Sequence, residues 1–111
     1  MGAFAIGQVV VLPFPFSNLE QNKNRPALLL ANVGRCDWIV CQITSKSYAD
    51  TRAIEISDDD FSTGSLQRLS YARAGKLFTA HESLFSGIAG KLKADKLQQI
   101  KNAVIEVLNH E

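Results

Sequence analysis

The sequence predicts a mainly β fold, a small and partly open antiparallel β-barrel followed by one C-terminal α-helix. Short runs rich in β-branched and aromatic residues recur between turn residues along most of the chain, as in Val9-Val10-Val11. The clearest helical period of apolar residues occurs only near the C-terminal end. Several short strands with tight turns and one helix are typical of small barrels.

The composition is that of one globular domain covering residues 1–111. Apolar residues make up 46% of the chain and charged residues 21%, which argues against disorder. The formal net charge is only +1, so a site for nucleic acid must depend on local charge. The N-terminus lacks a basic signal-peptide region, and no run of about 18 apolar residues is present. We therefore expect a cytoplasmic protein with no membrane segment.

The two cysteines, Cys36 and Cys41, are expected to be free thiols. On one strand they would stand about 16 Å apart, which is too far for a disulfide. A metal site needs more soft ligands than these, and no histidine or second cysteine pair is close in the sequence. The sequence therefore predicts no metal and no cofactor.

The first predicted strand covers Gln8–Pro13, an almost continuous apolar run that a proline ends. A polar loop over Ser17–Asn24 follows, and a second strand is expected over Ala27–Val33. Between them stands Arg25-Pro26. Proline fixes its own backbone angle and favours extended geometry in the residue before it. Arg25 is therefore expected to be held in place at the N-terminal end of a buried strand.

Gly34-Arg35 has the glycine-first pattern of a two-residue type II′ turn, so a third strand is expected over Cys36–Ile43. Antiparallel pairing about that turn places Arg25 opposite Thr44, with Cα atoms about 5 Å apart. The loops that precede Arg25 and follow Thr44 would then emerge side by side.

The rest of the chain has fewer distinct signals. A second polar loop is expected over Ser45–Thr51 and a short strand over Ala53–Ile56. Ser57–Asp60 is interpreted as a turn or helix cap and not as a Mg²⁺ site, because consecutive acids point in different directions. Two further short strands are predicted over Leu69–Ala72 and Lys76–Ala80, and a helical turn over His81–Phe85. The chain is predicted to end in a helix with one apolar stripe, formed by Leu97, Ile100, Val104, Val107 and Leu108.

An arginine beside a hydroxyl at one strand end is suited to binding phosphate. A guanidinium presents a planar fork of donors, and it stays charged at any physiological pH. Taken singly, however, Arg25 is as well explained as a solvated surface residue, and Thr44 by the preference of threonine for strands. Spacing alone therefore leaves both interpretations open.

Short segments spread along most of the chain form a recognisable set, namely Gly7–Val11, Pro13–Asn18, Lys23–Leu30, Ile43–Lys46, Ser70–Arg73, Lys76–Thr79 and Gly90–Leu92. The most specific combination among them is Arg-Pro-Ala-Leu, which begins at Arg25, with Ile-Thr-Ser, which begins at Ile43. Together these segments resemble the PemK/MazF family of toxins from type II toxin–antitoxin pairs. The resemblance implies an SH3-like barrel of the PemK/MazF/CcdB type, a homodimer, and a cognate antitoxin as partner.

The resemblance also implies an activity, the metal-independent cleavage of single-stranded RNA, including mRNA. The 2′-OH of the substrate attacks the adjacent phosphorus and leaves 2′,3′-cyclic phosphate and 5′-OH ends. Arg25 and Thr44 match the residues implicated in this cleavage and are predicted to be catalytic. The residues predicted to contact RNA are Asn22, Lys23, Asn24, Ser45, Lys46 and Tyr48. The loop before Arg25 lacks the glycine of many MazF-like proteins, so the cleaved sequence cannot be inferred.

The alternative is a non-catalytic interaction module on the same barrel. A gyrase poison of the CcdB type and a decayed toxin that only binds its antitoxin both belong to this class. The predicted pairing of Arg25 with Thr44 favours the nuclease, because a pure binder needs no such pair. His81 is expected to be a helix-start residue, and the sequence assigns no general base.

Overall fold

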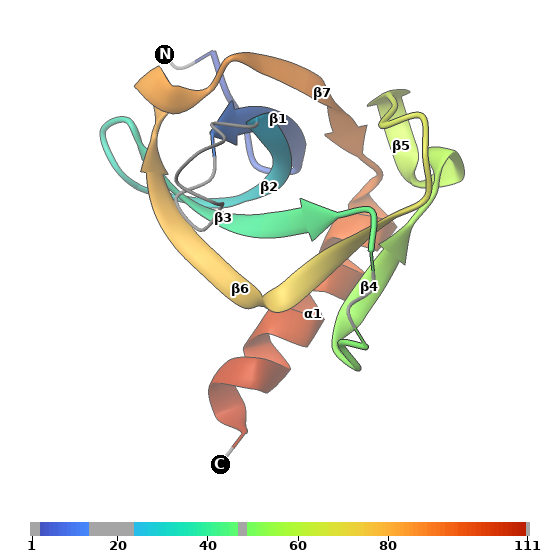
Figure 1. Cartoon of the computed structure of the whole chain (residues 1–111). Coiled ribbons are helices and arrows are strands. Elements are labelled where there is room, and N and C mark those ends of the chain that lie inside the picture. Colours follow the sequence, from blue (N-terminus) through green and yellow to red (C-terminus); the bar gives the residue numbers. More distant parts are fainter. Residues whose placement is uncertain (1–2, 14–23, 47–48, 111) are drawn as a thin grey trace.

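The chain forms one antiparallel sheet of seven strands and a C-terminal helix in a computed structural model that describes residues 3–13, 24–46 and 49–110. The strand order is β4-β6-β3-β2-β1-β7-β5, and the sheet curls into a partly open barrel with helix α1 below it (Figure 1). Among the described residues, no helix has the length and apolar character needed to cross a membrane. The elements are β1 (Gln8–Pro13), β2 (Asn24–Gly34), β3 (Asp37–Thr44), β4 (Ala53–Ile56), β5 (Phe61–Gly64), β6 (Ser70–His81), β7 (Gly87–Leu92) and α1 (Ala94–Asn109), with 3-10 turns at Asp58–Asp60 and Glu82–Leu84.

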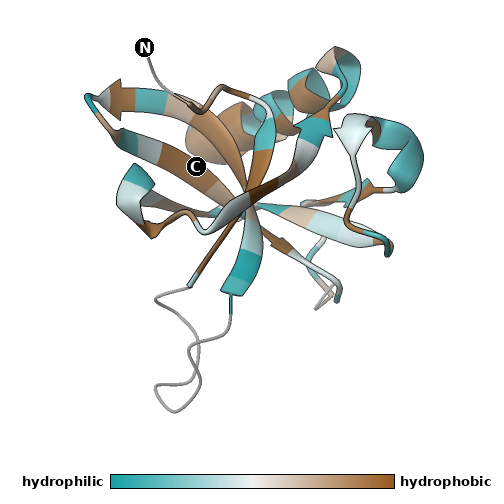
Figure 2. Cartoon of the chain, turned by 90° about the horizontal axis from the view of Figure 1, so that it is seen from above, coloured by the Kyte–Doolittle hydropathy of each residue, from teal (hydrophilic) through white to brown (hydrophobic). Residues whose placement is uncertain are grey.

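The central strands are buried on both faces. Val9 and Leu28 belong to a core cluster that includes residues of α1, whereas Val10 and Leu29 belong to a second cluster on the opposite face. All four side chains have no exposed surface. This double burial explains why β1 is an almost continuous apolar run and not an alternating one. Figure 2 shows apolar residues gathered in the middle of the strands and hydrophilic residues toward many of their ends.

Helix α1 closes the first cluster, as its apolar stripe predicts. Ile100 and Val104 are buried, and the helix packs against β6 and β4. Lys96 ties its first turn to the sheet, because Nζ donates to the Glu55 carbonyl at 3.0 Å and lies 3.6 Å from Asp60 Oδ2. One member of the predicted stripe is wrong: Leu108 is 72% exposed, because it lies at the last turn of the helix and is absent from both core clusters.

The predicted turn between β2 and β3 is displaced by one residue. Gly34 pairs with Asp37, so the turn is Arg35-Cys36, with Arg35 in the left-handed region at φ 44°. Two register shifts in this ladder leave β2 with two extra residues. Between these shifts and the start of β2, the register agrees with the prediction, since Ala27 pairs with Gln42 as expected if Arg25 stands opposite Thr44. Most of the first predicted loop, residues 17–23, lies outside the described residues, and Asn24 already belongs to β2.

The two short strands predicted around Gly75 are one long strand, β6, which bends sharply between its two halves (Figure 1). Its second half pairs with β3, and its first half pairs with both β3 and β4. A register shift between Cys41 and Ile43 on β3 accompanies the bend. The sequence did not predict β5 and β7, in which Gly64 and Gly90 face each other.

Three local predictions are confirmed. The Ser57 amide donates to Asp60 Oδ2 at 2.8 Å, which caps the 3-10 turn over Asp58–Asp60. His81 caps the next such turn, because its Nδ1 accepts from the Ser83 amide at 3.0 Å. Both cysteines are free. Burial raises the pKa of the Cys41 thiol to about 12, so this thiol stays protonated at neutral pH.

Candidate active site

Three neighbouring strands meet at the end of the sheet where β2 begins and β3 ends. Leu28 pairs with Cys41 and Ala27 with Gln42, so Arg25 and Thr44 continue the two strands toward the same end. On its other side, β3 borders β6, where Thr44 pairs with Tyr71. Thr44 therefore lies on the middle strand of the three, with Arg25 on one neighbour and the start of β6 on the other.

A pocket with a volume of about 260 Å³ lies at these strand ends. Residues from both faces of β2 and β3 contribute to it, so the pocket lies at the end of the hairpin and not on one face. The described residues that line it include two arginines and no acid. They are Asn24, Arg25, Pro26, Ile43, Thr44, Ser45, Leu66, Arg68 and Ser70.

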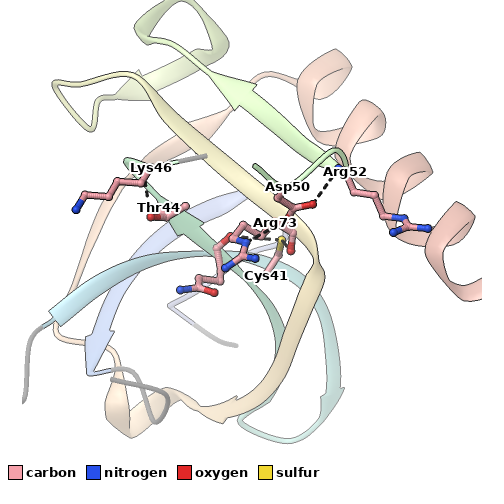
Figure 3. A network of polar contacts seen from close by, with 7 residues as sticks. Cys41, Thr44, Lys46, Asp50, Arg52 and Arg73 are labelled. Atoms are coloured by element: carbon pink, nitrogen blue, oxygen red, sulfur yellow. Dashed lines mark hydrogen bonds and ion pairs between the residues drawn. The ribbon is translucent and has the colours of Figure 1, made fainter. Parts of the chain in front are cut away.

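Thr44 is held with its hydroxyl in a fixed place. The residue is only 6% exposed, and its Oγ1 accepts from the Lys46 amide at 3.2 Å (Figure 3). Since this bond uses a lone pair of the oxygen, the hydroxyl hydrogen remains able to donate to a ligand. Such a donor suits a phosphate oxygen.

Arg25 is half-buried at the start of β2. Pro26 beside it pairs with Val11 of β1, so the backbone that carries the arginine is held in the sheet. Within the described part of the chain, neither a hydrogen bond nor an ion pair engages its guanidinium. Binding of an anion by the guanidinium therefore requires no hydrogen bond or ion pair with another described residue to break.

The loop that follows Thr44 is anchored at its far end. Asp50 accepts from the Arg52 amide at 2.9 Å and from Arg73 Nε of β6 at 3.1 Å (Figure 3). The hydrogen bond from the Arg52 amide and the pairing with Arg73 lower the pKa of the Asp50 carboxyl. Asp50 is therefore ionised at neutral pH and ties this loop to the same strand that borders Thr44.

The structure brings together half of the residues predicted for the site. Arg25, Thr44, Asn24 and Ser45 line the pocket. Lys46 is exposed and contacts Thr44 through its backbone amide, but it does not line the pocket. The other three predicted residues, Asn22, Lys23 and Tyr48, lie outside the described residues.

Sequence reasoning missed Leu66 and Arg68, which come from the connection between β5 and β6, and Ser70, which is the first residue of β6. They reach the pocket because β6 pairs with β3, although β4 and β5 separate the two strands in the sequence. No local pattern predicts that pairing. In the described ranges, no group of three or more His, Cys, Asp or Glu side chains is placed to hold a metal ion.

Solved structures with this fold include an endoribonuclease, a toxin and a MazE–MazF complex. The chain aligns with an endoribonuclease from a mycobacterial species in complex with its cognate antitoxin at 18% identity and a TM-score of 0.70, covering 97% of this chain and 95% of the other. For the Mycobacterium tuberculosis toxin MazF-mt6 the identity is 16%, the TM-score 0.71 and the coverage 94% and 98%. For MazF in the Deinococcus radiodurans MazE–MazF complex these values are 16%, 0.69, 96% and 95%.

At these identities the likeness shows the fold. No protein with a curated function matches the sequence significantly. The family model described as the PemK-like, MazF-like toxin of type II toxin–antitoxin systems matches residues 5–108, nearly the whole chain. The chain therefore belongs to the family of PemK-like, MazF-like toxins.

Proposed function

We propose that this toxin is an endoribonuclease that cleaves single-stranded RNA, including mRNA in the cytoplasm, without a metal ion. The observation that carries the proposal is one pocket lined by Arg25 and Thr44, with no acid among its described lining residues. A phosphodiester is anionic, so a site with guanidinium and hydroxyl donors and no carboxylate suits it. Family membership supports the role as a toxin, and relatives of the same fold are described as endoribonucleases.

In the proposed reaction the nucleophile comes from the substrate. The 2′-oxygen forms a bond to phosphorus and loses its proton, while the bond from phosphorus to the 5′-oxygen breaks and that oxygen gains a proton. The products are a 2′,3′-cyclic phosphate and a 5′-OH end. Arg25 stabilises the charge that develops on the phosphorane through a two-pronged contact. Thr44 donates its hydroxyl hydrogen to a non-bridging oxygen, with Ser45 as a second donor.

The RNA strand on either side of the cleaved bond would run along the residues beside the pocket. Asn24 and Ser45 line it, and Lys46 is exposed next to Thr44. With Asn22, Lys23 and Tyr48 they form the proposed RNA-binding set. Amide side chains can contact base edges, an aromatic ring can stack on a base, and lysines can neutralise phosphates.

Cleavage of a long RNA is expected to persist in excess EDTA, because the proposed nucleophile is the 2′-OH and needs no metal to generate it. The measurement is gel analysis followed by mapping of the 5′ ends, with chemical identification of cyclic phosphate at the 3′ ends. A strict requirement for Mg²⁺, or products with 5′-phosphate ends, would contradict this mechanism. If the folded protein does not cleave RNA at all, the non-catalytic interaction module becomes the better description.

We also propose that the toxin is a homodimer and that a segment of its antitoxin covers the groove of this dimer. Apolar side chains remain exposed at the ends of several strands and beside them, namely Ile6, Val33, Leu84 and Ile88. Burial of such side chains against a second copy would stabilise a two-fold dimer. Light scattering at micromolar concentration is expected to give twice the chain mass of 12.2 kDa, and the mass of a single chain would contradict the dimer.

A further inference from the structure

A second arginine, Arg68, lines the pocket from the connection between β5 and β6. It is exposed, and none of the described residues forms a hydrogen bond or an ion pair with its guanidinium. Together with Arg25 it makes the pocket positive in a chain whose net charge is only +1. Local charge of this kind is what binds a polyanion.

The segment that carries Arg68 is held on both sides. Before it, Ser65 donates through Oγ to Asp58 Oδ1 at 2.6 Å and accepts from the Gln67 amide at 2.8 Å. Gln67 has a φ of 62°, a left-handed conformation that is uncommon for a residue other than glycine. After it, the hydroxyl of Ser70 donates to the Arg68 carbonyl at 3.2 Å, and Ser70 is only 3% exposed. A strained and well-anchored backbone beside a pocket is typical of a functional site.

The strand order places the two arginines on opposite sides of Thr44. Arg25 lies on β2, Thr44 on β3, and Arg68 leads into β6 on the other side of β3. Backbones two strands apart in a sheet are separated by about 10 Å. That separation is wider than a single phosphate group. Two guanidiniums that start from these positions can therefore each bind a different phosphate of one strand.

We propose that Arg68 binds a phosphate next to the one that is cleaved, and so sets the position of the RNA strand across Thr44. This inference rests on the proposed nuclease function. A contact with a neighbouring phosphate adds binding free energy but does not touch the reacting atoms. Loss of Arg68 should therefore weaken RNA binding more than it slows the chemical step.

The test begins with a cleavage site mapped on long RNA, from which short substrates are made. One is a dinucleotide with only the scissile phosphate, and two trinucleotides add one nucleotide at the 5′ or 3′ side. For the wild type, at least one of the two trinucleotides should have a higher kcat/KM than the dinucleotide. Arg68→Ala should lower kcat/KM for that trinucleotide by about tenfold and leave kcat/KM for the dinucleotide unchanged. Binding is measured on a longer strand that cannot be cleaved, because a 2′-O-methyl group replaces the 2′-OH at the cleavage site. The slope of log Kd against the logarithm of the salt concentration should be smaller by about 0.7 for Arg68→Ala than for the wild type.

Arg52→Ala is the matched control. It removes the same charge from an exposed arginine that points away from Thr44 (Figure 3) and should leave all of these values unchanged. Thermal melting verifies that each variant folds, and Arg68→Gln replaces Arg68→Ala if the latter melts early.

Three outcomes would overturn the inference. An equal loss on the dinucleotide means that Arg68 acts on the scissile phosphate, and no loss on any RNA means that it does not bind this strand. Loss of binding to an acidic antitoxin peptide alone, with RNA cleavage intact, assigns Arg68 to the protein partner. In each of these cases wild-type cleavage still stands, whereas a wild type that neither binds nor cleaves RNA overturns the proposed function itself.

Discussion

Arg25→Ala is expected to lower the rate of RNA cleavage by roughly 100-fold or more, the usual loss when one preorganised donor to a transition state is removed. Arg25 is half-buried at the pocket, and no described carboxylate is paired with it, so the substitution leaves no described carboxylate without its partner. The free energy of unfolding should therefore change by about 1 kcal/mol or less. Single-turnover cleavage and urea unfolding measured on the same preparation separate the two effects.

Arg25→Lys is the first control for this result. An ammonium keeps the charge but cannot make the planar two-pronged contact, so only part of the activity should return. Thr44→Val in combination with Arg25→Ala should cost less than the sum of the two single changes, because both residues are proposed to act on one phosphate. If Arg25→Ala cleaves RNA normally and instead loses antitoxin binding, Arg25 is an interface residue and the catalytic site lies elsewhere.

Gly64→Ala is expected to destabilise the fold by about 3 kcal/mol or more, and to lower the melting temperature by roughly 10 °C or more. Gly64 has a φ of 73°, and a Cβ placed on it would lie 2.2 Å from the Ala89 carbonyl oxygen. The clash is with backbone of the neighbouring strand, which a side-chain rotation cannot relieve. Calorimetry of the folded protein measures the effect.

Gly75→Ala is the matched control for Gly64→Ala. A Cβ at Gly75 would meet no atom within 4 Å, and its backbone is not left-handed. Alanine lowers the conformational entropy of the unfolded chain relative to glycine. The free energy of unfolding should therefore stay within about 1 kcal/mol of the wild-type value or rise slightly. Equal melting temperatures for the two variants would mean that β5 and β7 do not approach closely in solution.

Much of the secondary structure was predictable because local sequence decides it. The bounds of β1 and β4 agree with the predictions, since apolar β-branched runs bounded by turn residues specify short strands. The terminal helix was predicted from its period, and only Leu108 fails to pack. The errors lie where neighbouring strands decide the outcome. Gly34-Arg35 has a good turn pattern, but the two extra residues of β2 move the turn to Arg35-Cys36.

By itself, the sequence determined a mainly β fold, the family, and the placing of Arg25 and Thr44 at the same end of one hairpin. These properties depend on neighbours in the chain or on a short motif. Only the tertiary structure decided that β6 lies beside β3, and hence that Arg68 and Ser70 complete the pocket. Two strands far apart in the sequence pair because together they bury the core, and no residue near either strand encodes that choice. A separate long-range pairing, that of β5 with β7, brings these two strands so close that only glycine fits at Gly64.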